Sequence, residues 1–462
     1  MDPMFKNVFE RRQFDFFRSR TIPSSNSYLA SRFWERVVPQ MCHNEPAIKH
    51  AVLALGSVHR LADFPEEDPY GREQHLLEIK GQYGKAIASA RQLLSRAGER
   101  DLQTVLVACV IFICYENMQG HAKEAQVHLR SGLQILEEQL HANPALTSQP
   151  NSDIEDTTDM LRRLDFSAMT FSDARFPYKF MPVQSYARGL GRPPRNAVGI
   201  DRLRGYLISY IRLLFGLGFQ IGIRLGEHDE CESPNDSTTY QALMRQYEEL
   251  EVKFMEWHQT FELMVLELPQ SLHDQNWRSI TLLRIYYSIP ELILKVGFFG
   301  PETRWDSEVE KFREITRLAA TLIDAPIGPE KQSRFASFGF DIGIILPLLL
   351  TGHHCRDPFI RREAVRMLYS SNRQEGVFNS IGAAAIAEAI LHAEERGLDN
   401  VQCAADVPET QRINQNAFRV DTERNEIRLT TSSQPFGPDG PWDIQEQILN
   451  YNSPLSQFVG TV

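Results

Sequence analysis

Residues 101–140 read DLQTVLVACVIFICYENMQGHAKEAQVHLRSGLQILEEQL, and this stretch decides the fold. Its first half, Val105–Tyr115, is apolar almost without interruption, which is too short for a membrane span but fits a helix buried on every side. After a break at Gly120, apolar residues recur at spacings of three and four, as on one face of an amphipathic helix. The stretch therefore predicts an αα-hairpin. Because a fully buried helix needs neighbours all round, we predict an all-α fold, a multi-helix array around this hairpin.

Length and composition set the outer limits of the prediction. The chain has 462 residues, more than one compact core usually holds, so it forms either two domains or an extended helical array. Its 42% hydrophobic and 24% charged residues are ordinary for a globular protein, and no membrane span is expected. The net charge of −11 argues against extensive contact with nucleic-acid phosphates. The six cysteines are scattered without C-x-x-C spacing, which favours a reducing compartment.

Helical periodicity extends over most of the chain. Asn44 is expected to cap a helix that begins near Pro46, and Asp357 to cap one that begins at Pro358. Pro290 is expected to kink or split the helix that contains it. The other predicted helices lie at about 70–97, 157–171, 202–226, 238–266, 276–299, 305–323 and 380–396.

Three segments depart from the helical pattern, and a last short helix is expected after them. Residues 141–156 are polar and contain Pro, Asn and Ser, which predicts a mobile loop. Residues 173–199 hold four prolines and are predicted to be irregular. Residues 416–430 alternate polar and apolar side chains around a turn, which predicts a small C-terminal β-hairpin that packs on the helices. Residues 442–451 are expected to dock as a short helix.

The sequence carries no recognised catalytic motif. It has no P-loop, no G-x-S-x-G and no H-E-x-x-H, and no set of residues supplies an acid, a base and a nucleophile. Residues 216–222, GLGFQIG, look like a dinucleotide fingerprint, but the third glycine stands one place late and no strand precedes it. Small residues that allow close packing of helices are the better interpretation. We predict no catalytic and no cofactor-binding residue.

Metal ligands are not predicted either. His353-His354-Cys355 is the best candidate, but adjacent helical residues point in different directions, so at most two of them can share one ion. Asp357 stands nearby and is already assigned to a helix cap. His50 and His59 are interpreted as satisfied histidines at the edge of the core.

Basic residues occur as the pairs Arg11-Arg12, Arg162-Arg163 and Arg361-Arg362 rather than as clusters. Such pairs suit surface salt bridges better than DNA binding. In the helix that begins at Pro358, the buried stripe is expected at Ile360, Ala364 and Leu368, with the arginines pointing elsewhere.

Several stretches resemble, in the same order, the middle and C-terminal regions of fungal Zn(2)Cys(6) binuclear-cluster transcription factors. They are SRFWERVVPQ at 31–40, NEPAIKHAVLALG at 44–56, the central hairpin, and CRDPFIRREA at 355–364 followed by Glu375-Gly376. The resemblance covers roughly residues 9–400. It implies a nuclear regulator of transcription, with residues 1–400 as its helical regulatory domain and 401–462 as a C-terminal tail. It also implies control of a biosynthetic, secondary-metabolite gene cluster.

The family's zinc cluster has no counterpart in this sequence. Its DNA-binding module needs six cysteines in C-x2-C-x6-C sets, and this spacing occurs nowhere here, so the family's zinc ligands carry over to no residue. A truncated product, an alternative start and a member that lost the module all fit this observation. We therefore expect action through protein partners, either the transcription machinery or a zinc-cluster factor, without direct DNA binding, cofactor or enzymatic activity.

Other partners and functions stay open at this point. A small-molecule effector in a helical pocket and a homodimer are both compatible with the sequence. Residues 120–136 resemble the second helix of a tetratricopeptide unit, so a helical interaction scaffold is one alternative, although no second copy follows at a fixed period. An enzyme with an unrecognised helical cavity is another.

Overall fold

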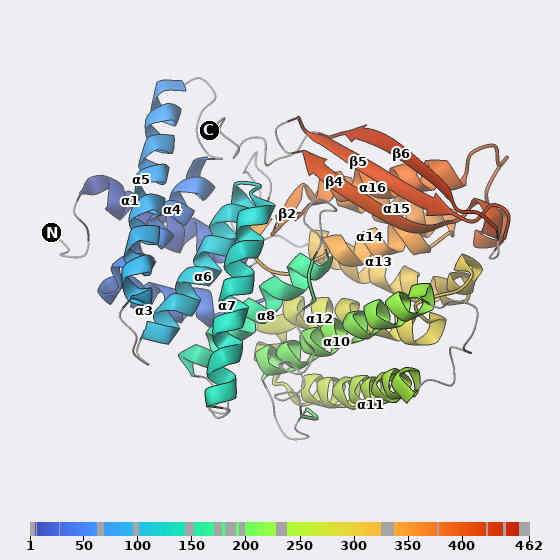
Figure 1. Cartoon of the computed structure of the whole chain (residues 1–462), viewed down its shortest axis with the longest axis horizontal. Coiled ribbons are helices and arrows are strands. Elements are labelled where there is room, and N and C mark those ends of the chain that lie inside the picture. The colour runs from blue at the N-terminus through green and yellow to red at the C-terminus, as the bar shows by residue number, and fades with distance from the viewer. Residues whose placement is uncertain are drawn as a thin grey trace.

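The chain is mainly helical in the computed structural model (Figure 1). The structure describes residues 5, 7–26, 28–61, 69–95, 101–143, 152–170, 178–180, 191–193, 199–227, 238–324, 337–376, 378–421, 424–437 and 440–451. The α-helices in the first half are α1 (Val8–Phe16), α2 (Ile22–Ser25), α3 (Val38–Asn44), α4 (Pro46–Leu61), α5 (Pro69–Leu94), α6 (Asp101–Met118), α7 (Ala122–Ala142) and α8 (Asp153–Thr170). Those in the second half are α10 (Ile200–Glu227), α11 (Thr238–Glu267), α12 (Gln270–Val296), α13 (Val309–Asp324), α14 (Ile345–His354), α15 (Pro358–Ser371) and α16 (Ser380–Glu394).

Shorter elements complete the chain. Two π-helical turns, η1 (Phe17–Thr21) and η2 (Phe33–Val37), lie among the first helices. The 3-10 turns are η5 (Glu302–Glu308), η7 (Ala404–Asp406) and η8 (Glu409–Gln411). The strands are β1 (Ser337–Gly339), β2 (Arg373–Glu375), β3 (Phe378–Asn379), β4 (Ile413–Asp421), β5 (Glu426–Ser433) and β6 (Asp443–Asn450).

The predicted hairpin is formed by α6 and α7 and is confirmed. Every side chain from Thr104 to Gln119 is buried, and α6 packs against α4, α5, α7 and α8. Gly132 lets α7 approach its neighbours, since a Cβ there would come within 3.2 Å of the Cys109 Cβ and 3.3 Å of Leu161. The all-round burial of α6 therefore follows from helices on all sides of it.

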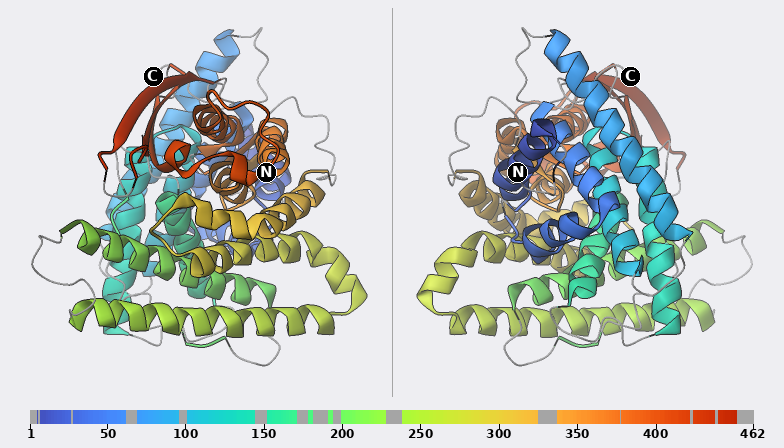
Figure 2. Two further views of the ribbon diagram at one scale, coloured as in Figure 1. Left: turned by 90° about the vertical axis from the view of Figure 1, so that its right-hand side faces the viewer. Right: turned by 90° about the vertical axis from the view of Figure 1, so that its left-hand side faces the viewer.

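Two hydrophobic clusters fill the molecule. The first is centred on α4, α6 and α7, and the second on α10, α12, α14 and α16. Helix α8 belongs to both, because Leu161 and Leu164 enter the first cluster and Phe166 enters the second. In Figure 2, α11 lies along the outer edge of the second half in both views.

The C-terminal strands form a three-stranded antiparallel sheet in the order β4-β5-β6. Ile427 and Leu429 of β5 are buried against α16, where Gly382 leaves room for Ile427. The predicted hairpin is thus confirmed and carries a third strand. The short helix expected at 442–451 is wrong, because Ile444 and Ile448 alternate with polar residues at the period of a strand. Strands β1, β2 and β3 form a separate small sheet.

Some predicted helix boundaries are wrong. Helix α7 reaches Ala142 and α8 begins at Asp153, so both ends of the loop expected at 141–156 are helical, while 144–151 lie outside the described residues. The acidic residues read as loop form the first turn of α8, where they suit the helix dipole. Asn44 ends α3 instead of capping α4. Helix α12 continues unsplit through Pro290.

The segment predicted to be irregular lies mostly outside the described residues. Its described positions, 178–180, 191–193 and 199, are neither helix nor strand. Within the described ranges, no helix combines the length and the apolar character needed to cross a membrane.

Candidate functional site

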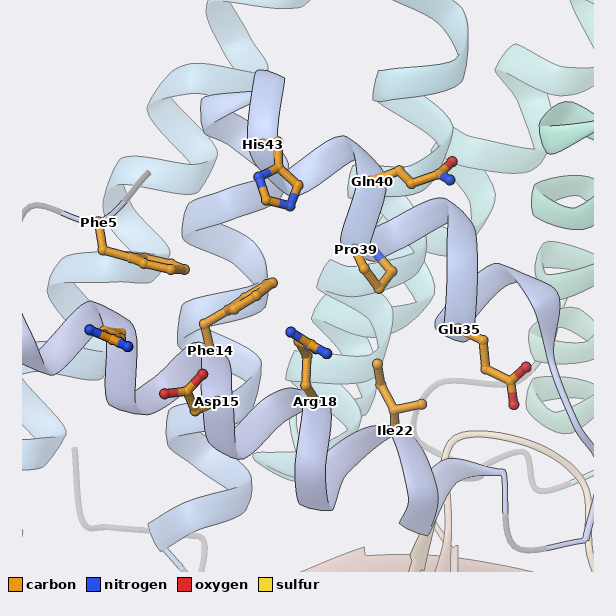
Figure 3. A pocket seen from close by; sticks show the side chains of 10 residues that line it. Phe5, Phe14, Asp15, Arg18, Ile22, Glu35, Pro39, Gln40 and His43 are labelled. Carbon is orange, nitrogen blue, oxygen red and sulfur yellow. The ribbon is translucent and has the colours of Figure 1, made fainter. Parts of the chain in front are cut away.

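A pocket of about 590 Å³ opens on the N-terminal helices and is the candidate site (Figure 3). It joins the first helical stretch, residues 8–25, to the second, residues 33–44. The lining residues are Phe5, Arg11, Phe14, Asp15, Arg18, Ile22, Glu35, Pro39, Gln40 and His43.

The two π-helical turns contribute directly to this pocket. Asn7 starts α1 by accepting a hydrogen bond from the backbone N–H of Glu10 at 2.8 Å, and the helical run continues through η1 into α2. A π-helical turn is wider than an α-helical one, which changes where the side chains around it point. η1 supplies Arg18 to the pocket and η2 supplies Glu35. Isolated π turns are frequent at functional sites.

Close packing fixes the turns from the core side. Phe17 of η1 is fully buried and meets Trp34 of η2 with 6.2 Å between ring centroids. A Cβ on Gly56 of α4 would come within 3.1 Å of the Phe17 Cβ, so only glycine lets these elements approach so closely. Trp34 and Gly56 belong to the sequence stretches 31–40 and 44–56, which therefore support the walls of the pocket.

The pocket combines an apolar floor with an unpaired positive charge. Phe5 and Phe14 lie 5.2 Å apart between ring centroids. Figure 3 shows the Arg18 guanidinium directed into the space between Phe14 and Pro39. Among the described residues, neither Arg18 nor Arg11 has a carboxylate within ion-pair distance. A guanidinium over apolar side chains suits an organic anion whose carboxylate pairs with it while its apolar part covers the floor.

The surroundings of the pocket are also basic. Arg12, Arg20 and Arg36 are exposed on the same N-terminal elements. Glu35 accepts a hydrogen bond from Asn26 at 2.8 Å and is thereby held at the rim. The N-terminal elements therefore carry more arginines than carboxylates, although Asp15 and Glu35 also line the pocket and the whole chain carries a net charge of −11.

A second pocket, of about 410 Å³, lies between α5, α6 and α7. Its polar groups already bind one another. Glu116 accepts hydrogen bonds from the Tyr83 hydroxyl and from His121 Nδ1, the latter at 2.8 Å, and this hydrogen bond raises the pKa of His121. Tyr83 also stacks on Tyr115 at 4.0 Å. Because these polar groups already bind one another, the second pocket offers a ligand fewer hydrogen-bonding groups than the pocket that contains Arg18.

The histidines singled out from the sequence are engaged in packing. His354 Nδ1 lies 3.1 Å from Glu302 Oε2 and its ring stacks on Trp305, whereas His353 Nε2 lies 3.3 Å from the Ile413 carbonyl oxygen. Cys355 is buried. In the part of the chain that the structure describes, no three His, Cys, Asp or Glu side chains are placed to hold a metal ion.

His50 and His59 both have hydrogen-bond partners. His50 Nδ1 lies 2.7 Å from Gln82 Oε1, and His59 Nδ1 lies 2.9 Å from Thr21 Oγ1. Burial, together with the charge of Arg20, lowers the pKa of His59 to about 4. Their interpretation as satisfied histidines at the edge of the core agrees with these contacts.

Residues 216–222 lie within α10 and pack against aromatic rings. A Cβ on Gly218 would come within 2.5 Å of the Phe298 ring, and one on Gly222 within 2.9 Å of Phe299. The glycines therefore serve close packing, as expected, although the neighbours are two phenylalanine side chains rather than a second helix.

Arg361 of the resemblance signature was expected to point away from the buried stripe, and this expectation is wrong. Arg361 is fully buried, and its guanidinium lies 2.7 Å from Glu394. Arg356 donates to the same carboxylate at 2.7 Å and to Glu302 at 2.7 Å. The backbone N–H of Ile413 donates to Glu394 as well, at 2.7 Å, which ties β4 to α16. Position 361 has the helical spacing of the buried stripe at 364, 365 and 368, and this signal could have revealed its burial.

The pair Arg162-Arg163 also contains a buried arginine. Arg163 is buried and pairs with Asp341 and, at 3.3 Å, with Asp159. It also donates to Ser31 at 3.1 Å. Because adjacent helical residues point about a quarter-turn apart, one arginine of such a pair can be buried while its neighbour is not.

Glu375, the other signature residue, caps α14. Its carboxylate accepts the backbone N–H groups of Ile344 at 2.9 Å and Ile345 at 3.2 Å, and it pairs with Arg373 at 2.8 Å. A Cβ on Gly343 would lie 1.9 Å from its Oε1. The carboxylate therefore occupies space that only a glycine leaves open.

Comparison with known proteins identifies the class of this helical assembly. The profile of the fungal specific transcription factor domain matches residues 12–387, which contain nearly the whole pocket. The aspercryptin biosynthesis cluster-specific transcription regulator atnN of Emericella nidulans is 23% identical over 320 residues, which cover 68% of this chain and 50% of that relative. No solved structure matches the chain.

The fold and the match together define a helical domain of transcription regulators. The chain belongs to the fungal specific transcription factor domain family, and the family membership expected from the sequence is confirmed. The chain spans about half the length of the curated relative that it matches.

Proposed function

We propose that this chain is the regulatory part of a nuclear transcription regulator that controls a biosynthetic gene cluster. The observation that carries the proposal is the family match over residues 12–387, supported by the relative whose name describes a cluster-specific transcription regulator. In this proposal, residues 1–400 are the regulatory domain and 401–462 the tail. The chain acts through protein contacts, with the transcription machinery or a zinc-cluster factor, and performs no catalysis.

The pocket on the N-terminal helices is the proposed effector site. Arg18, directed into the space between Phe14 and Pro39 without a carboxylate partner in the described ranges, supports an organic anion with an apolar body as the ligand. A volume of about 590 Å³ fits a small amphiphilic carboxylate.

A fusion to a heterologous DNA-binding domain tests the regulatory role. The full chain, tethered upstream of a reporter gene, should change reporter transcription relative to the DNA-binding domain alone, because regulation through protein contacts needs no DNA contact of its own. Transcript levels measured by quantitative PCR give the readout. Unchanged transcription, at equal nuclear levels of fusion and control, would contradict the proposal.

Decanoate tests the effector site, because it joins a carboxylate to an apolar chain. Binding should raise the melting temperature, and decanoate at ten times its dissociation constant should add about 1.4 kcal/mol of stability. Decanamide, which lacks the charge, should not bind. Arg18→Glu should abolish the shift, whereas Arg12→Glu, an exposed arginine outside the lining, should keep it. Equal shifts in both variants would rule out this pocket.

A further inference from the structure

Strand β6 forms an open edge of the C-terminal sheet (Figure 1). It pairs with β5 in regular register from Asp443 to Asn450, and within the described residues no strand pairs with its other side. Ile444 is 65% exposed and Ile448 is 52% exposed, on the face of the sheet that points away from the helices. An edge strand of this length with exposed apolar residues is a template for another strand.

The edge has little of the usual protection against pairing, since Asp443 and Glu446 are the only charged residues of β6. β6 contains no lysine and no proline, and its register with β5 shows no bulge. Gln445 and Gln447 are exposed although they are opposite Thr431 and Leu429, the β5 residues that face the helices. The helical layer therefore does not cover β6. A further strand that pairs with its free edge meets no helix on either face of the sheet.

The sequence of β6 is complementary to itself. Residues 444–448 read IQEQI, the same in both directions. Antiparallel pairing about a two-fold axis at Glu446 places Ile444 opposite Ile448 of a second copy, and Gln445 opposite Gln447. Glu446 then meets its own copy, and Arg428 of the same chain, 3.0 Å from each carboxylate, offsets part of their repulsion.

We propose that the chain forms a symmetric dimer in solution by antiparallel pairing of β6 with β6 of a second copy. The two sheets then become one continuous six-stranded sheet. The apolar stripe on α11, which includes Leu263 and Leu266, is a poorer surface for a second copy. Glu248, Glu249 and Glu251 are exposed on the same helix, so two copies would bring like charges together.

Sedimentation of the full chain tests the dimer. Between about 1 and 100 μM, the wild-type mass should approach twice 53.0 kDa. Combined Ile444→Lys and Ile448→Lys should weaken dimerisation at least about tenfold, because each substitution acts twice in a two-fold interface. Leu266→Lys makes the same change at an exposed leucine of α11 and should leave the dimer intact. Circular dichroism checks that the variants keep their helix content.

Charge exchange tests the register. The double variant Arg428→Glu with Glu446→Arg keeps an ion pair within each chain but reverses it. Mixed with wild type, it should form heterodimers above the statistical half in native mass spectrometry, because Glu446 then meets an arginine. Statistical mixing would overturn the proposed pairing, and so would a monomeric wild-type chain or a dimer that survives the isoleucine substitutions.

Discussion

The Glu394 carboxylate pairs with two buried guanidinium groups, those of Arg356 and Arg361. Burial alone would raise its pKa, but Arg356, Arg361 and the Ile413 N–H together lower it to about 2. Arg356 and Arg361, which belong to the resemblance signature, thus connect α14, α15, α16 and β4 through Glu394. Their role is structural, and it explains why both arginines are buried.

Glu394→Gln should destabilise the fold by about 3–5 kcal/mol, because it leaves buried guanidinium charge without its counter-charge. Urea unfolding followed by circular dichroism measures the loss. Glu363→Gln is the matched control: it removes an exposed pair with Arg366, whose side chain is 64% exposed, and should cost less than about 1 kcal/mol. Equal losses in the two variants would contradict the buried network.

The same carboxylate predicts a pH dependence. The pKa of Glu394 is about 2 in the folded chain and about 4.3 in an unfolded one, so its contribution, of order 3 kcal/mol, is complete above about pH 5. As the pH falls from 5 towards 2, the folded state loses this contribution. Unfolding free energies measured over this range should therefore fall less steeply for Glu394→Gln than for the wild type.

At the scale of elements, α6 organises the first half of the molecule. It is an unusual helix because every side chain from Thr104 to Gln119 is buried. Its partner α7 is half-buried, and the turn at Gly120, with φ of 76°, joins them. The burial pattern of both helices was readable from the sequence, since an all-apolar run and a stripe leave few alternatives.

Leu106→Asp should abolish soluble expression, because it places an unpaired charge at a fully buried position of α6. The yield of soluble chain after expression is the measurement. Val127→Asp, on the same hairpin but at a side chain that is 47% exposed, should leave the yield unchanged. A folded Leu106→Asp variant would show that α6 is less central than its burial indicates.

At the scale of the whole molecule, the two hydrophobic clusters exchange segments. Tyr28 and Leu29 lie in the connection between α2 and η2 but enter the second cluster, while Phe338 and Phe340 come from the second half but enter the first. The buried pair Arg163–Asp341 crosses the same boundary. The halves are therefore interlocked, and the family match over 12–387 extends across both of them.

The regular helices were predictable from the sequence, whereas the pocket and strand β6 were not. The cap and the apolar stripe of α15 were recovered, as was the approximate range of α16, because Asp357 and the apolar spacing are local signals. The pocket was missed because it depends on two π-helical turns and on contacts between separate helices, which a periodic pattern does not record. β6 was read as a helix because eight residues with few apolar side chains carry too weak an alternation.

The contact between Gly343 and Glu375 has a consequence for sequence variation. A methyl group at position 343 and a carboxylate at position 375 cannot occupy the same space, and the carboxylate is needed to start α14. We therefore expect the two positions, 32 residues apart along the chain, to vary together. Among relatives that keep this helix start, we expect glycine at 343 to accompany glutamate at 375, and an alignment in which the two positions vary independently would contradict this.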